Sequence, residues 1–193
     1  MIVIGIVGDI ASGKTYVSQV FESFGYRVFY ADKVVHVMYR NNNNINLKIS
    51  KLFKLKLYKK RINLKDLVNL IINSKIKLQQ LNKIIHPEVK KKLLIFIKKN
   101  KKKKLIILDI PLLLETDFKV FADIIIFIDT KKNDLIKFRK KRKIDTRLIK
   151  VLEKFHFDKV VKKKMSDFII RNSNLKFLKS QIKTIIDTIV LDD

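Results

Sequence analysis

The fold of this chain is most constrained by its first 25 residues, where a continuous apolar run leads into a glycine-containing loop and then into helical periodicity. Residues 2–7 are all apolar or glycine, which is typical of a strand buried on both faces of a parallel sheet. Over residues 14–24 the apolar positions recur at spacings of three and four, which predicts a helix that ends at Gly25. All four glycines of the 193-residue chain lie in this segment, so the loop is where the backbone needs unusual freedom.

The rest of the chain alternates short apolar runs with helical patterns. The runs predict four more buried strands, over residues 27–30, 105–109, 124–129 and 168–170. Helical periodicity fills the intervals, over residues 31–40, 47–100, 148–165 and 175–191, and the asparagines at 41–44 end the first of these helices. Such alternation predicts a doubly wound, parallel, five-stranded α/β sheet with its chemistry at the carboxyl ends of the strands.

Two stretches interrupt this regular pattern. Residues 47–100 show helical periodicity alone, so we interpret them as a helical insertion between the second and third strands. Within it, Pro87 follows His86 and is expected to restart the helix, because proline suits a first helical turn. A dense basic stretch, residues 131–147, joins the fourth strand to the helix predicted after it.

The loop after the first strand carries the pattern GxxxxGK[ST], as Gly8–Thr15. Between a strand and a helix this pattern predicts a nucleoside triphosphate site, in which backbone N–H groups and the helix dipole surround a phosphate. We expect Lys14 to bridge the β- and γ-phosphates and the Thr15 hydroxyl to face Mg²⁺. The predicted triphosphate-binding residues are Gly8, Ala11, Ser12, Gly13, Lys14, Thr15 and Tyr16. The pattern leaves the phosphoryl acceptor open.

Two aspartates at predicted strand ends are candidates for the chemistry. Asp32 is a candidate base for an attacking hydroxyl, and it is equally suited to capping the helix that follows. Asp109 is a candidate Mg²⁺ ligand behind the first coordination shell, with a buried structural carboxylate as the alternative. A GTPase would need a base-reading NKxD motif, which the chain lacks.

Composition excludes some classes and weakens others. The chain has no cysteine and no apolar run long enough to span a bilayer, and its N-terminus lacks the features of a signal peptide, so we expect a cytoplasmic protein without a membrane partner. The formal charge of +26 suggests a nucleic-acid partner. However, 37 of the 44 basic residues are lysine and only 7 are arginine, and Lys, Ile and Asn, which have A/T-rich codons, are all abundant. We therefore interpret the charge as solvated surface and expect no specific nucleic-acid partner.

Taken in order along the chain, the motifs resemble those of the dephospho-CoA kinase family. They are the loop Gly8–Thr15, Ala31-Asp32, His86-Pro87, Asp109-Ile110-Pro111-Leu112-Leu113-Leu114-Glu115, Ala122-Asp123 and Asp167-Phe168-Ile169-Ile170-Arg171-Asn172. The segment from Pro111 to Glu115 is the most specific of them, and the resemblance covers essentially the whole chain.

This resemblance implies ATP-dependent phosphorylation of the ribose 3′-hydroxyl of dephospho-CoA, the last step of coenzyme A biosynthesis, with ATP and Mg²⁺ bound in a P-loop NTPase-type fold. It implies a single domain with a core over 1–40, 105–135 and 165–193, a helical acceptor-binding insertion over about 41–100, and a small basic lid over about 136–150. The implied catalytic residues are Asp32 as base, Lys14, Arg139 and Arg142, and the implied acceptor-binding residues are Asp32, His86, Pro111, Leu112 and Glu115.

The chain departs from the family pattern at several positions. Asp9 and Ala11 replace two usual glycines, so Asp9 is expected to point outward, away from phosphate, and Tyr30 replaces a frequent aspartate. In the lid the family favours two arginines four residues apart. Here the residue four positions after Arg139 is Lys143, and the residue four positions before Arg142 is Phe138. His156 or Phe157 stands near the place of a usual glutamine. A different small-molecule kinase, acting on a nucleotide or a sugar, is the remaining enzyme alternative.

Overall fold

The computed structural model describes residues 1–72, 74–141, 145–172 and 174–191, and the chain divides into two compact units. Unit 1 comprises Met1–Tyr30, Asn100–Ile144 and Phe155–Asp193, and unit 2 comprises Ala31–Lys99 and Asp145–Lys154. The core expected over 1–40 therefore extends past the division, which falls where the second strand passes into the next helix.

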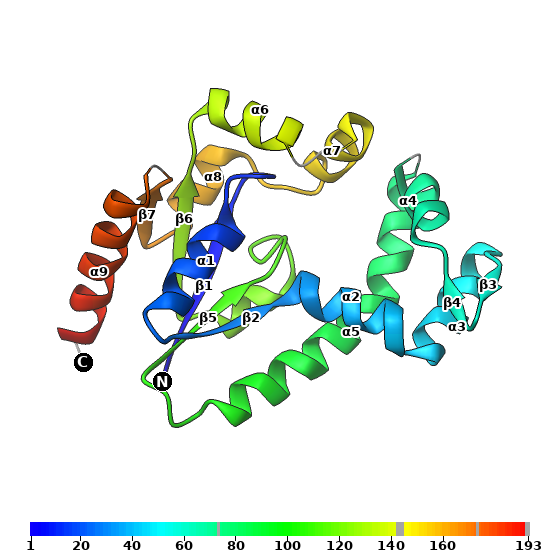
Figure 1. The fold of residues 1–193 in the computed structure, drawn as a ribbon, viewed down its shortest axis with the longest axis horizontal. Coiled ribbons are helices and arrows are strands. Elements are labelled where there is room, and N and C mark those ends of the chain that lie inside the picture. Colours follow the sequence, from blue (N-terminus) through cyan, green and yellow to red (C-terminus); the bar gives the residue numbers. More distant parts are fainter. Residues whose placement is uncertain (73, 142–144, 173, 192–193) are drawn as a thin grey trace. The chain divides into compact units, whose positions relative to one another are not determined.

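Unit 1 is built on a five-stranded parallel sheet with the order β2-β5-β1-β6-β7 (Figure 1). Its strands are β1 (Ile2–Gly8), β2 (Arg27–Tyr30), β5 (Leu105–Asp109), β6 (Ile124–Asp129) and β7 (Phe168–Arg171). The five predicted strands and the parallel arrangement are thus confirmed. Because β1 lies in the middle and pairs with both β5 and β6, the loop that follows β1 emerges at the centre of the carboxyl edge.

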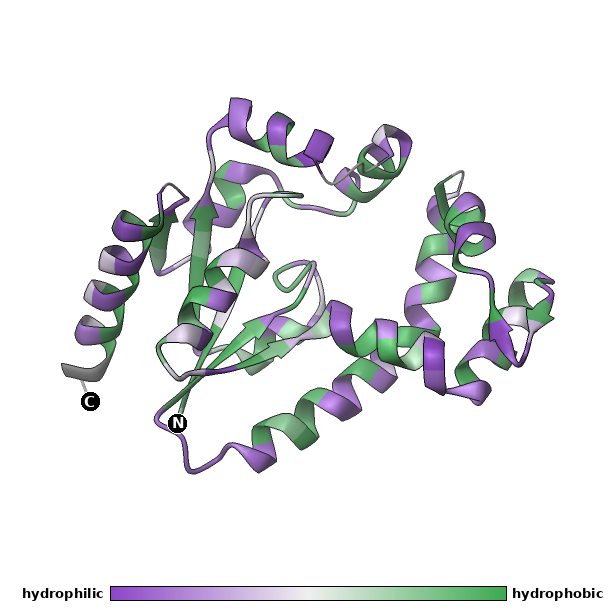
Figure 2. Ribbon diagram, viewed as in Figure 1, coloured by the Kyte–Doolittle hydropathy of each residue, from purple (hydrophilic) through white to green (hydrophobic). Residues whose placement is uncertain are grey.

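The core of unit 1 forms where helices cover the sheet. The helices and the 3₁₀ turn of this unit are α1 (Lys14–Ser23), η1 (Asp117–Phe121), α6 (Lys132–Lys141), α8 (Lys159–Lys164) and α9 (Leu175–Leu191). Phe21 of α1, Ile6 of β1 and Ile182 of α9 are fully buried in one apolar cluster. The strands are mostly hydrophobic, whereas α6 is largely hydrophilic and buries none of its residues (Figure 2).

An aspartate directly precedes each of the strands β6 and β7 and accepts a hydrogen bond from the backbone of the neighbouring strand. Asp123 accepts a hydrogen bond at Oδ2 from the N–H of Val3 at 2.8 Å, and Asp167 accepts one from the N–H of Ile125 at 2.7 Å. At the far edge, the side-chain amide of Gln181 on α9 bonds both the N–H and the C=O of Arg171 in β7, at 2.9 and 3.0 Å. These contacts give the motif aspartates 123 and 167 a structural role in setting the strand register.

Unit 2 is mainly helical, with a small hairpin. Its elements are α2 (Ala31–Asn41), α3 (Asn43–Phe53), β3 (Leu57–Tyr58), β4 (Arg61–Ile62), α4 (Leu64–Ile72), α5 (Lys75–Lys99) and α7 (Thr146–Glu153). The break expected at the asparagine run is confirmed, because Asn42 separates α2 from α3 and accepts a bond from the N–H of Ile45 at 3.1 Å, as an N-cap. The helices α2, α3 and α4 pack on α5, and α7 packs on α4.

Three expectations about local structure are wrong. Residues 47–100 contain the antiparallel hairpin β3–β4 as well as helices. Pro87 lies inside the continuous helix α5 and does not restart it, since the buried positions Leu81, Ile85 and Val89 continue through the proline. The helix expected over 148–165 is two helices, α7 and α8.

Candidate active site

The loop between β1 and α1 contains two residues in the left-handed region of backbone conformation. Gly13 has φ +89°, in the left-handed region, and is the N-cap of α1. Ala11 has φ +67°, also left-handed, which costs a residue with a side chain about 1–2 kcal/mol. This strain falls at one of the positions where the family usually has glycine. Lys14 and Thr15 then form the first turn of α1, and Tyr16 is 40% exposed.

The N-terminal end of α1 has the properties of an anion site. The first hydrogen bond of the helical ladder runs from the N–H of Val17 to the carbonyl of Gly13, so the N–H groups before Val17 lie ahead of the ladder. Ser12 is 1% exposed, and its Oγ has no hydrogen-bond partner among the described residues. A buried hydroxyl beside a helix N-terminus fits a phosphate group that would complete its bonding.

Lys14 lies folded over the loop that precedes it. Its Nζ donates to the carbonyl oxygens of Gly8 at 3.0 Å and Asp9 at 2.9 Å. Both acceptors belong to the predicted phosphate loop, so the ammonium is held at the loop itself. A phosphate entering the loop would meet this cation.

Asp109 and Tyr30 end adjacent strands of the sheet. They are paired in the register of β2 with β5, and Asp109 is 7% exposed. Burial and a hydrogen bond to Glu22, at 3.1 Å between Tyr30 Oη and Glu22 Oε2, raise the pKa of Tyr30, which therefore stays a neutral hydrogen-bond donor. Asp32 belongs to unit 2, where it is exposed in the first turn of α2.

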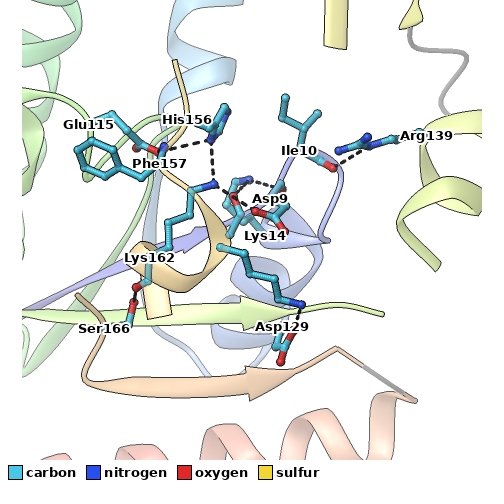
Figure 3. A network of polar contacts seen from close by, with 12 residues as sticks. Asp9, Ile10, Lys14, Glu115, Asp129, Arg139, His156, Phe157, Lys162 and Ser166 are labelled. Carbon is cyan, nitrogen blue, oxygen red and sulfur yellow. Dashed lines mark hydrogen bonds and ion pairs between the residues drawn. The ribbon is translucent and has the colours of Figure 1, made fainter. Parts of the chain in front are cut away.

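Asp9 is paired with a buried lysine that sequence reasoning did not identify (Figure 3). Lys162 of α8 is 2% exposed, and its Nζ donates to Asp9 Oδ1 at 3.2 Å. Asp9, which was expected to point outward, thus directs its carboxylate to this ammonium. The pair joins residues 153 positions apart in the chain, and no local pattern marks it.

The same lysine connects the loop to Glu115 (Figure 3). Nδ1 of His156 lies 3.1 Å from Lys162 Nζ and 3.5 Å from Glu115 Oε1, and the N–H of Phe157 donates to Glu115 at 2.9 Å. Burial opposes ionisation of Glu115, but the bonds from His156 and Phe157 outweigh it and hold its pKa below the usual value. Both residues near the usual glutamine position therefore contact Glu115.

The remaining predicted acceptor residues lie in different units. Pro111 and Leu112 precede Glu115 in unit 1, where Pro111 is exposed and Leu112 has a left-handed φ of +57°. His86 is half-buried within α5 of unit 2.

A second acidic centre stands at the end of β6. Asp129 accepts hydrogen bonds from Lys159 and Lys163 of α8, each at 2.6 Å. Partial burial would raise the pKa of Asp129, but these two ammonium groups hold it below the usual value. Lys163 also lies 5.8 Å from the ring centre of Phe127.

Of the two arginines expected in the lid, Arg139 contacts the loop between β1 and α1. It lies on α6, and its Nε donates to the carbonyl of Ile10 at 3.3 Å. Arg142 and Lys143 lie outside the described residues. The expected lid, residues 136–150, includes part of α6 in unit 1 and part of α7 in unit 2.

Unit 2 contains a groove of about 730 Å³ that begins one residue after Asp32. Its lining residues combine lysine, apolar and asparagine side chains: Lys33, Val34, Val37, Met38, Asn41, Asn42, Asn43, Asn44 and Lys92. The α2 residues in this set share one face of that helix, at spacings of three and four. The sequence did not indicate which residues of the helical insertion would line such a groove.

Within residues 1–72, 74–141, 145–172 and 174–191, no group of three or more acidic, histidine or cysteine side chains is placed to hold a metal ion. The helices among these described residues also lack any segment with the length and hydrophobicity of a membrane span.

Comparison with known proteins supports the assignment of these motifs. The family model described as dephospho-CoA kinase matches residues 2–176. Dephospho-CoA kinase of Wolbachia sp. subsp. Brugia malayi is 33% identical over 192 residues, covering 98% of both chains, and that of Zymomonas mobilis is 32% identical over 197 residues, also covering 98% of both.

Two solved structures share the fold. Dephospho-CoA kinase from Campylobacter jejuni is 25% identical, with a TM-score of 0.69 over 97% of this chain and 96% of that one. A protein from Thermus thermophilus is 22% identical, with a TM-score of 0.79 over the same shares. The sheet is therefore that of a P-loop kinase, and the chain belongs to the dephospho-CoA kinase family.

Proposed function

We propose that this chain transfers the γ-phosphoryl group of ATP to the ribose 3′-hydroxyl of dephospho-CoA, the final step of coenzyme A biosynthesis. The observation that carries the proposal is the loop Gly8–Thr15, whose strained backbone, buried Ser12 hydroxyl and folded Lys14 form an anion site in a chain of this family. Its relatives are named for this substrate, and we extend it to this chain.

The phosphate loop supplies binding and charge. Its backbone N–H groups and the N-terminal dipole of α1 would hold the β-phosphate, with Gly8, Ala11, Ser12 and Gly13 shaping the loop and Tyr16 completing the first turn. Lys14 would leave the carbonyls of Gly8 and Asp9 to bridge the β- and γ-phosphates. Arg139, already bonded to the loop through Ile10, would add charge to the transferring group.

Thr15 and Asp109 are our candidates for holding Mg²⁺ together with ATP. The donor set fits this ion, because a hydroxyl and a carboxylate are the oxygen ligands that Mg²⁺ prefers, with phosphate oxygens and water completing its shell. When bound, the ion would neutralise negative charge on the phosphates. Asp109 is held nearly buried at the end of β5, which limits its movement.

Asp32 is our candidate base for the acceptor hydroxyl. It is exposed at the start of α2, and the groove of unit 2 begins at the next residue. The part of α2 that lines the groove, from Lys33 to Asn41, spans about 12 Å at 1.5 Å per residue, and Asp32 directly precedes it in the chain.

The lining of the groove suits the chemistry of dephospho-CoA. Lys33 and Lys92 would match its diphosphate, Val37 and Met38 its apolar segment, and the asparagines its amides. We further propose that His86, Pro111, Leu112 and Glu115 help to bind the acceptor. A cytoplasmic location and the lack of a specific nucleic-acid partner stay predictions from the sequence.

The decisive experiment is a phosphoryl-transfer assay with ATP and Mg²⁺, comparing dephospho-CoA with a panel of nucleotide and sugar acceptors. We expect dephospho-CoA to be strongly preferred, and preference for another acceptor would favour the alternative kinase.

Lys14→Ala should retain the fold and abolish turnover. Asp32→Asn should lower turnover by orders of magnitude and spare ATP affinity, because it removes the proton acceptor and keeps the shape. A collapse of ATP affinity in Asp32→Asn would instead make Asp32 a Mg²⁺ ligand.

A further inference from the structure

The carbonyl oxygen of Ser12 is held by side chains from the ends of two neighbouring strands. Thr130, which follows β6, donates from Oγ1 at 2.7 Å, and Asn172, which follows β7, donates from Nδ2 at 2.8 Å. Thr130 is 2% exposed, so water does not compete for its bond. Neither residue belongs to the phosphate-loop motif Gly8–Thr15.

These bonds fix the direction of one peptide group in the phosphate loop. The peptide between Ser12 and Gly13 is planar and trans, so the N–H of Gly13 points opposite to the C=O of Ser12. Holding that carbonyl toward the ends of β6 and β7 therefore turns the Gly13 N–H away from them. This N–H lies ahead of the α1 ladder, which starts with Val17.

Asn172 also fixes how closely the loop approaches the sheet. A Cβ added to Gly13 would collide with Nδ2 of Asn172, and Gly13 has a φ of +89° that favours glycine. The Ser12 hydroxyl is buried without a partner among the described residues. The carbonyl of this peptide is thus bonded by two side chains, whereas the hydroxyl of the same serine still has unused hydrogen-bonding capacity.

We propose that Thr130 and Asn172 are positioning residues for nucleotide binding: by holding the Ser12 carbonyl, they aim the Gly13 N–H at the triphosphate. The inference rests on the proposed function, because it needs ATP in the loop. The two side chains come from different strands and share one acceptor. Loss of either donor leaves the peptide partly held, and loss of both frees it to rotate.

The test measures ATP affinity for single and double variants by calorimetry. Thr130→Val, which keeps the shape and removes the donor, should weaken ATP binding about three- to tenfold, and Asn172→Asp, which replaces the donor with an acceptor, should do the same. The double variant should lose ATP affinity by a factor larger than the product of the two single-variant factors, because either donor alone partly holds the carbonyl. Thr130→Ser keeps the hydroxyl donor and should retain the wild-type affinity for ATP.

The control and the alternative outcomes separate positioning from stability. Thr188→Val removes a hydroxyl that donates to Thr184 at 3.0 Å on the exposed face of α9, and it should leave ATP affinity unchanged. A melting curve without nucleotide reports structural damage. If Thr130→Val and Asn172→Asp lose stability and keep wild-type ATP affinity, the positioning role is wrong. If the wild-type chain itself binds no ATP, the proposed function fails first.

A measurement on the wild-type chain keeps the test independent of variant folding. The amide proton of Gly13 should shift strongly downfield in NMR spectra when ATP and Mg²⁺ are added, since it gains a charged acceptor. The amide proton of Gly25, which follows the end of α1, should stay in place. An unmoved Gly13 resonance at saturating ATP would overturn the inference.

Discussion

Replacing the buried Lys162 with methionine should show how the loop tolerates an aspartate beside phosphate. At the 3.2 Å that separates Lys162 Nζ from Asp9 Oδ1, an effective dielectric constant of about 20 gives an attraction of about 5 kcal/mol. Most of this is offset by the cost of removing Lys162 from water, since its side chain is 3% exposed. The Asp9 side chain is 24% exposed and partly hydrated, so we expect a net coupling of about 1–3 kcal/mol.

The assay is a double-mutant cycle in urea unfolding, with Lys162→Met, Asp9→Asn and the combination of both. Lys162→Met should lower the free energy of unfolding and also weaken ATP binding, because Asp9 is then uncompensated. Adding Asp9→Asn should recover part of both losses. The matched control Lys164→Met, on the exposed side of the same helix, should change stability by less than about 0.5 kcal/mol. Strictly additive effects of the two substitutions would refute the coupling.

Three further perturbations test other parts of unit 1. Because the pKa of Glu115 is lowered in the folded chain, the stability that it contributes is present above the usual value of 4.5 and is lost as the pH falls through the lower folded value. In urea unfolding across that pH range, the free energy of unfolding of Glu115→Gln should fall less steeply with decreasing pH than that of the wild-type chain. Gly5→Ala should destabilise the fold by about 1–3 kcal/mol in the same assay, since its Cβ would collide with Leu113. Arg139→Lys should reduce turnover about 10²–10³-fold and Arg142→Lys should be nearly silent, whereas equal mild effects would mean that neighbouring lysines supply the charge.

The sheet was predictable because buried parallel strands read as continuous apolar runs, which no other element of this length imitates as well. The hairpin β3–β4 was missed for a physical reason. Its turn places Lys59 and Lys60 at φ +50° and +65°, where asparagine or glycine is the usual signal. Lys54 ends α3 with φ +53° in the same way. In this chain lysine occupies turn positions that a sequence pattern would assign to other residues.

In the candidate site, the residues within a local motif could be predicted from the sequence, whereas the contacts from distant residues could not. The loop Gly8–Thr15 was recognisable because its chemistry lies within eight consecutive residues. Its partners Thr130, Lys162 and Asn172 are 118 to 160 positions away from the loop residues that they hold. Asn172 closes a motif that the sequence did single out, but its contact with the loop, like those of Thr130 and Lys162, is visible only in the folded chain, because single side chains at such separations carry no periodicity.

The amide of Gln181 has a consequence for how this protein behaves at high concentration. β7 is the last strand of the sheet, and its outer side would otherwise offer the N–H and C=O of Arg171 as a template for a strand from another molecule. The side chain of Gln181 on α9 bonds both groups, as the backbone of a neighbouring strand would. Gln181 thus removes one pair of backbone groups through which a second molecule could extend the sheet, at an edge where Ile169 is 46% exposed.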